Sequence, residues 1–173
     1  MGEDRHSILP AEIADPAAAE GPAAAQRLFV RRIDALPDLV AFTAAFFERH
    51  GIDRELLLAV DFAIEELFTN MVKYGDSAAP VEVRLAPIPG GIEVRLTERD
   101  STAFDVTHAP DADVTLPASR REPGGLGLHL TRRLLDTIEY DYSPDRRESR
   151  IIFRKTGSPG RGERSDDEDR IGR

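Results

Sequence analysis

Two stretches of alternating apolar residues, 81–88 and 91–98, flank a proline- and glycine-containing turn at residues 89–91. Alternation with a period of two puts the apolar side chains of each stretch on one face of a strand, and a glycine turn between two such stretches is typical of a β-hairpin. The hairpin therefore predicts an antiparallel sheet with one buried face. The residues expected to point into that face are Ile92, Val94, Leu96 and, at the end of the strand, Glu98.

The remaining patterns predict three helices and three further strands. Proline near the start and glycine after the end mark a helix from Pro37 to Gly51, and Asp53 is a good N-cap for a second helix that runs to Tyr74, with Gly75 after its end. A third helix is expected from about Gly125 to Asp136. The further strands are expected at 27–33, 137–142 and 149–155. This order predicts an α+β fold, a two-layer sandwich of a mostly antiparallel sheet with three helices on one face.

These patterns all lie within residues 27–156, which predicts one folded domain. Residues 1–26 are rich in alanine, proline and glutamate, and residues 157–173 are glycine-rich and charged, so a disordered arm and a disordered tail are expected. The chain has no cysteine, which excludes disulfides and thiolate metal sites. The first residues lack the apolar core of a signal peptide, and no apolar run reaches the roughly 20 residues that cross a bilayer. A cytoplasmic location without membrane contact is expected.

The net charge of −9 argues against a nucleic-acid partner. Proteins that bind DNA or RNA neutralise phosphates with clustered lysine and arginine side chains, and this chain has the opposite balance. We therefore expect no direct contact with nucleic acid.

The second helix carries polar groups on an apolar face. At about 100° per residue Asn70 falls inside the apolar sector and Glu66 lies at its edge, one turn apart. Removing a carboxylate and an amide from water is costly unless a partner binds them, and a metal–phosphate group would be such a partner. The alternative is that both side chains bond neighbouring backbone.

Residues 123–130, Pro-Gly-Gly-Leu-Gly-Leu-His-Leu, come directly before the third helix. Glycines let backbone N–H groups approach a phosphate, and a helix N-terminus adds partial positive charge. An ordinary turn is the alternative. Glu98 is the other candidate, because a buried acid at a strand end can accept a hydrogen bond from an exocyclic amine such as that of adenine. A plain strand-end carboxylate is the alternative there.

Taken together, these segments resemble the GHKL ATPase superfamily, whose ATP-binding fold is of the Bergerat type, and within it the anti-sigma regulatory serine/threonine kinases. The stretch DFAIEELFTNMVKYG is similar to the N box of that family, and PGGLGLHLTRRLLDTIEY is similar to its second glycine box. The segment STAFDVTHAP resembles the start of the family's lid. The resemblance covers about residues 27–155.

The resemblance implies ATP and Mg²⁺ as cofactors and a role for each matching residue. Asn70 would bind Mg²⁺, and Glu66 would act as general base on a substrate serine or threonine. Residues 104–123 would form a mobile lid. The residues implied to surround the phosphates are Gly124, Gly125, Leu126 and Gly127.

The first glycine box departs from the family, which has D-x-G where this chain has LTERDSTAFD at 96–105. Counting back from Phe104 puts Arg99 and Ser101 at the Asp and Gly positions. Counting forward along the strand puts Glu98 and Asp100 there, with one extra residue before Phe104. A third register reads residues 100–102 as D-x-G. Strand alternation favours Glu98, and all three registers lack the glycine.

The resemblance implies a protein kinase of a partner-switching system, which would sequester a sigma factor and phosphorylate a STAS-type antagonist. It also implies a possible homodimer, since family members often dimerise. The altered first glycine box leaves a second hypothesis open, a GHKL-fold binding module that regulates a protein partner without efficient use of ATP. The catalytic domain of a histidine kinase is disfavoured, because no dimerisation helices with a phosphoacceptor histidine precede the domain.

Overall fold

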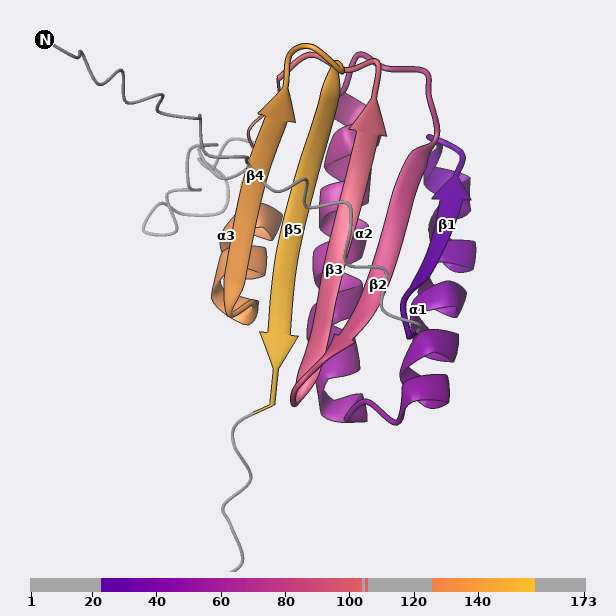
Figure 1. The fold of residues 1–173 in the computed structure, drawn as a ribbon, viewed down its shortest axis with the longest axis vertical. Helices are drawn as coiled ribbons and strands as arrows, with labels where there is room; N and C mark the ends of the chain where they lie inside the picture. Colours follow the sequence, from indigo (N-terminus) through magenta and orange to yellow (C-terminus); the bar gives the residue numbers. More distant parts are fainter. Residues whose placement is uncertain (1–22, 104, 106–125, 158–173) are drawn as a thin grey trace, which may run out of the picture.

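The computed structural model describes residues 23–103, 105 and 126–157. It has two layers, with the strands of one antiparallel sheet in front and the helices behind it (Figure 1). The strands lie in the order β1-β2-β3-β5-β4. Their bounds are Ala25–Phe29 for β1, Val81–Ile88 for β2, Gly91–Arg99 for β3, Thr137–Ser143 for β4 and Glu148–Thr156 for β5. The predicted α+β sandwich is confirmed.

The sheet buries one set of alternating side chains, as the hairpin pattern predicts. Leu85 of β2 pairs with Val94 of β3, Val94 pairs with Phe153 of β5, and Phe153 pairs with Ile138 of β4. This row of apolar side chains crosses four strands on the face that the helices cover. Because side chains alternate between the two faces along β3, Glu98 lies on this buried face, and Arg95 and Arg99 lie on the opposite face.

The helices begin and end where local signals predict. Helix α1 spans Leu36–His50 with proline in its first turn, and Gly51 ends it in the left-handed conformation, with φ of 60°. The side chain of Asp53 accepts a hydrogen bond from the backbone N–H of Glu55 and caps a short 3-10 turn, which leads into α2 at Leu57–Tyr74. Helix α3 spans Leu126–Leu134.

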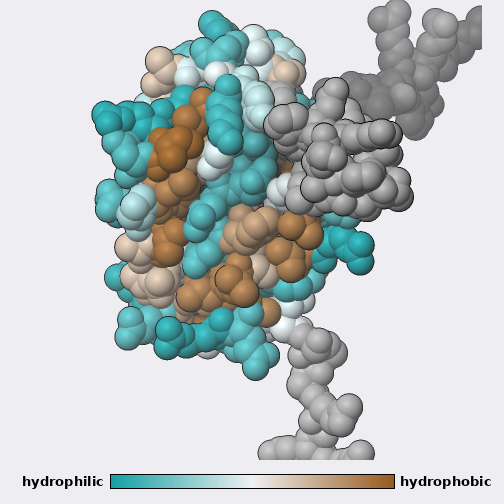
Figure 2. Space-filling model, turned by 180° about the vertical axis from the view of Figure 1, so that it is seen from behind, coloured by the Kyte–Doolittle hydropathy of each residue, from teal (hydrophilic) through white to brown (hydrophobic). Residues whose placement is uncertain are grey.

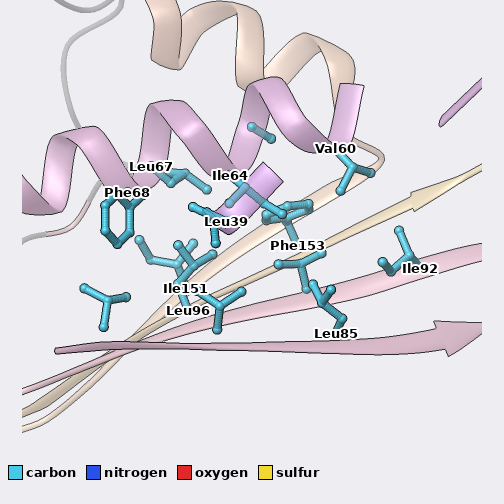
Figure 3. Packing of buried hydrophobic residues seen from close by; sticks show 14 of the residues in the cluster. Leu39, Val60, Ile64, Leu67, Phe68, Leu85, Ile92, Leu96, Ile151 and Phe153 are labelled. Atoms are coloured by element: carbon cyan, nitrogen blue, oxygen red, sulfur yellow. The ribbon is translucent and has the colours of Figure 1, made fainter. Parts of the chain in front are cut away.

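Helix α2 contributes most to the core because it lies over the centre of the sheet. Val60, Ile64 and Leu67 point from this helix toward the strands (Figure 3), and each is almost completely buried. Burial of such side chains is worth roughly 1.5–3 kcal/mol each. They pack above residues from three strands, among them Leu85, Leu96, Ile151 and Phe153. The core thus fixes α2 on the sheet, and with it any polar side chain on the flank of α2.

The face that carries the helices shows separate apolar patches among hydrophilic side chains (Figure 2). Leu58 of α2 is 82% exposed, and Leu130 and Leu134 of α3 are also exposed. Within the described residues, no helix combines the length and the apolar character that crossing a membrane requires.

Three details differ from the sequence-based expectation. Strand β1 covers Ala25–Phe29 rather than 27–33, because the chain turns into a short 3-10 helix at Ile33–Ala35. At about 100° per residue Tyr74 falls in the apolar sector of α2, but its side chain is 58% exposed. Gly75 ends α2 with extended backbone, so its φ does not require glycine. The predicted arm (1–26), lid (104–123) and tail (157–173) lie mostly outside the described residues, although β1 begins at Ala25, inside the predicted arm.

Candidate functional site

Glu66 and Asn70 lie one turn apart on the flank of α2, and both are half-buried. The side-chain N–H of Asn70 donates to Oε1 of Glu66 over 3.0 Å. A carboxylate only accepts hydrogen bonds, so the bond turns the amide nitrogen of Asn70 toward Glu66. The amide oxygen of Asn70 then has no hydrogen-bond partner within the described part of the chain.

Helix α3 starts directly beside this pair. A Cβ placed on Gly127 would overlap the carboxylate of Glu66, so the backbone of the first turn of α3 touches that side chain. The close approach favours glycine at 127, because an added Cβ would force the Glu66 carboxylate to shift; the φ of Gly127 is not in the left-handed region. Gly127 of the glycine-rich segment therefore lies against Glu66, which is in turn hydrogen-bonded to Asn70.

These groups fit a metal–phosphate ligand. An amide oxygen is a ligand type that Mg²⁺ accepts, and the unpaired N–H groups of a helix N-terminus attract phosphate. Asn70 supplies the first and the start of α3 supplies the second. Of the four residues expected to surround the phosphates, Gly124 and Gly125 lie outside the described residues. Leu126 begins α3, and only its backbone is described.

Glu98 faces inward as the strand alternation predicts, and it is 3% exposed. Its carboxylate pairs with the guanidinium of Arg31, whose side chain is 7% exposed. Arg31 also donates to the backbone carbonyl of Met71, the residue after Asn70. Burial lowers the pKa of Arg31, while the nearby carboxylate of Asp76 raises it. Sequence reasoning missed Arg31, since a single basic residue after a strand carries no recognisable pattern.

Gly75 makes room for this buried pair. A Cβ on Gly75 would overlap the guanidinium of Arg31 and would lie 2.6 Å from the carbonyl oxygen of Met71 and 2.7 Å from Oε1 of Glu98. Arg31 therefore joins three elements: the segment after β1, the last turn of α2 and the end of β3. This cluster lies at the Asn70 end of α2.

The backbone after β3 supports the register counted forward along the strand. Asp100 has a φ of 54°, in the left-handed region that favours glycine but that aspartate tolerates. It occupies the position where that register expects glycine, and its side chain is exposed. Arg99 faces the other side of the sheet and pairs with Glu82 and Glu148. The nucleotide contacts expected of Glu98 and Asp100 stay predictions.

Ser101 and Thr102 are held by hydrogen bonds to two different elements, β5 and the loop after α2. Ser101 is buried, and its hydroxyl lies 3.0 Å from that of Ser149. The backbone N–H of Thr102 donates to Oδ1 of Asp76 over 3.0 Å. That bond, with a second one from the Thr102 hydroxyl, lowers the pKa of Asp76. The segment that replaces the first glycine box is thus tied to the loop that follows α2.

The comparisons with known proteins agree with this fold. Residues 29–155 match the model of the histidine kinase-like ATPase domain family. Among solved structures, the chain is similar to the RsbU and RsbW domains of Rv1364c from Mycobacterium tuberculosis, with a TM-score of 0.54 and 14% sequence identity. That match covers 77% of this chain and 32% of the other, so it shows the fold alone. Comparison with curated proteins gave no match.

The family match includes every described residue of the site, from Arg31 through Glu66, Asn70 and Glu98 to Gly127. It also covers all three helices and the four strands β2 to β5. The expected GHKL resemblance is therefore confirmed at the level of the superfamily. The chain belongs to the histidine kinase-like ATPase domain family.

Proposed function

We propose that this protein is an ATP-dependent serine/threonine kinase of a partner-switching system, which phosphorylates a STAS-type antagonist and sequesters a sigma factor. The observation that carries the proposal is the contact of Gly127 with Glu66, which is itself hydrogen-bonded to Asn70. It brings a carboxylate, an amide oxygen and a helix N-terminus together in a domain of the histidine kinase-like ATPase family.

In this proposal the metal–phosphate groups and the carboxylate act at different steps. The amide oxygen of Asn70 and the backbone at the start of α3 hold Mg²⁺ and phosphate. Phosphoryl transfer needs mainly positioning and neutralisation of charge, and bound Mg²⁺ would supply the neutralisation. Glu66 accepts the proton of the substrate hydroxyl. Because Glu66 also bonds Asn70, one carboxylate serves both the orientation of the amide and the transfer of the proton.

The test has a binding arm and a transfer arm. At 100 times its dissociation constant, Mg·ATP should stabilise the folded chain by about 2.7 kcal/mol, measured as a thermal shift. Asn70→Ala should remove most of that shift, whereas Glu65→Ala, next to Glu66 on the same helix, should keep it. In the transfer arm, the chain and Mg·ATP are incubated with a STAS-domain protein from the same cell. Phosphate found by mass spectrometry on a serine or threonine supports the proposal, and phosphate on a histidine contradicts it.

The Arg31–Glu98 pair favours a second candidate, a binding module that regulates a protein partner without efficient use of ATP. The carboxylate that would accept the amine of adenine already has a cation partner inside the protein. No thermal shift at millimolar Mg·ATP, together with retained binding of the sigma factor, would support this candidate over the kinase.

A further inference from the structure

We propose that Arg31 determines the base specificity of the nucleotide site. By binding the carboxylate of Glu98, Arg31 withdraws that acceptor from the base, so a nucleotide is held through its phosphates and metal with little contribution from the base amine. This inference rests on the nucleotide site proposed above and adds which part of the ligand that site recognises.

The first step of the argument is that the pair is hard to explain by stability alone. Both side chains are more than nine-tenths buried. Taking two charges out of water costs several kcal/mol each, and apolar side chains of similar volume often stabilise a fold equally well. In the described part of the chain, Nε and Nη2 of Arg31 and Oε1 of Glu98 are buried without a hydrogen-bond partner, so the polar atoms of the ion pair are not fully satisfied.

The second step is the position of the pair. Arg31 bonds the carbonyl of Met71, directly after Asn70, and Glu98 is the last inward-facing residue of β3. The pair therefore joins α2, which carries Glu66 and Asn70, to the end of β3, which leads into residues 99–103. A base attached to a triphosphate at Asn70 and Gly127 would have to extend to this end of α2 to meet Glu98.

The third step is chemical. A buried carboxylate without a partner is a strong acceptor for an N–H group, and a hydrogen bond to a charged group changes affinity by roughly 10- to 150-fold. In the folded chain the guanidinium of Arg31 forms an ion pair with this carboxylate. Removing the guanidinium leaves Glu98 in need of a donor, and the 6-amino group of adenine can provide one.

The experiment compares two ligands that differ in that amino group alone, Mg·ATP and the Mg complex of purine riboside triphosphate. Dissociation constants are measured by calorimetry with the full chain. In the unmodified protein the two constants should agree within about threefold. In Arg31→Met, ATP should bind at least tenfold more tightly than the analogue, which corresponds to the lower bound for one hydrogen bond to a charged group.

Two further variants keep the proposal testable if Arg31→Met is unstable. The double variant Arg31→Met/Glu98→Gln replaces the buried ion pair by neutral side chains and should return the ratio of the constants to that of the unmodified protein. Arg95→Met removes an arginine from the opposite face of the sheet and should leave the ratio unchanged.

The outcomes separate the two proposals. An unmodified protein that already prefers ATP tenfold, or an Arg31→Met variant with an unchanged ratio, would overturn the role of Arg31 and leave the nucleotide site standing. Failure of every variant to bind either ligand would overturn both the nucleotide site and the role of Arg31.

Discussion

Asn70 donates its side-chain N–H to Glu66, four residues earlier on the same flank of α2, over 3.0 Å. The bond decides which atom of Asn70 is available, because the amide nitrogen is engaged and the oxygen is not. Metal ligands in proteins are commonly oriented by such a neighbouring hydrogen bond, and loss of the neighbour lowers metal affinity. Glu66 is therefore expected to affect metal binding as well as proton transfer.

The variants Glu66→Gln and Glu66→Ala should separate these two roles. The carbonyl of glutamine can still accept the bond from Asn70 but cannot take up a proton, so Glu66→Gln should bind Mg·ATP within about threefold of the unmodified protein and lose phosphotransfer. Alanine removes the bond, worth about 0.5–1.5 kcal/mol, so Glu66→Ala should also bind two- to tenfold more weakly. Calorimetric titration measures the affinity of each variant for Mg·ATP, and the transfer assay with the STAS-domain protein measures phosphotransfer. Equal affinities for the two variants would show that the bond does not orient Asn70.

Gly127→Ala tests the contact between α3 and Glu66. The added Cβ would overlap the Glu66 carboxylate, and such overpacking typically costs 1–3 kcal/mol, although alanine favours a helix by about 1 kcal/mol over glycine. We expect a net loss of stability in urea unfolding. In a Glu66→Ala background the same substitution should be neutral or stabilising. Additive effects of the two substitutions would mean that the side chains do not meet.

The sequence predicts most of the fold because its signals are local. Gly51 and Asp53 mark the break between α1 and α2, and the alternation in 81–98 sets the buried face of the hairpin, all within a few residues of the structure they specify. The start of β1 is less well predicted, since a five-residue edge strand with mostly exposed side chains shows little alternation.

In the candidate site, too, the sequence predicts the residues that local patterns mark and misses those that only tertiary packing brings together. Glu66 and Asn70 are visible in the sequence because one helix brings them together, and Gly127 is visible because it lies in a glycine-rich segment. Arg31 is not visible, since its bond to Met71 joins residues 40 positions apart that only the packed sheet and helix bring into contact. Gly75 follows the end of α2 as the sequence predicts, but its close contact with Arg31 depends on the same packing and is not visible in the sequence.

Gly75→Ala and Gly51→Ala should therefore destabilise the chain for different reasons. At Gly51 nothing lies within 4 Å of an added Cβ, and the cost of about 1–2 kcal/mol comes from left-handed backbone. At Gly75 the cost comes from overlap with the guanidinium of Arg31 and with the backbone carbonyl of Met71. An Arg31→Ala background should relieve part of the substitution at Gly75 and leave that at Gly51 unchanged, as a double-mutant cycle of unfolding free energies would show. Equal coupling of both glycines to Arg31 would contradict this account.

Asp61 makes the stability of the chain depend on pH. Burial, and then the charge of Glu65 one turn later, raises the pKa of Asp61 from its ordinary value to about 6. The folded chain therefore keeps a proton that the unfolded chain has lost between about pH 4 and 6, so this carboxyl lowers stability as the pH rises through that window and costs most above it. The cost is on the order of 1 kcal/mol, after a discount for the exposed half of the side chain.

Asp61→Asn replaces the carboxyl by a neutral side chain of the same shape, so it should stabilise the chain by about that amount at pH 7.5 and by nothing at pH 4. Urea unfolding at the two pH values measures the difference. Asp145→Asn, at an exposed acid in the turn between β4 and β5, serves as the control and should show no comparable change between the two pH values. A gain for Asp61→Asn that is equally large at pH 4 would have to come from packing or helix propensity, and would show that the Asp61 carboxyl does not titrate in this range.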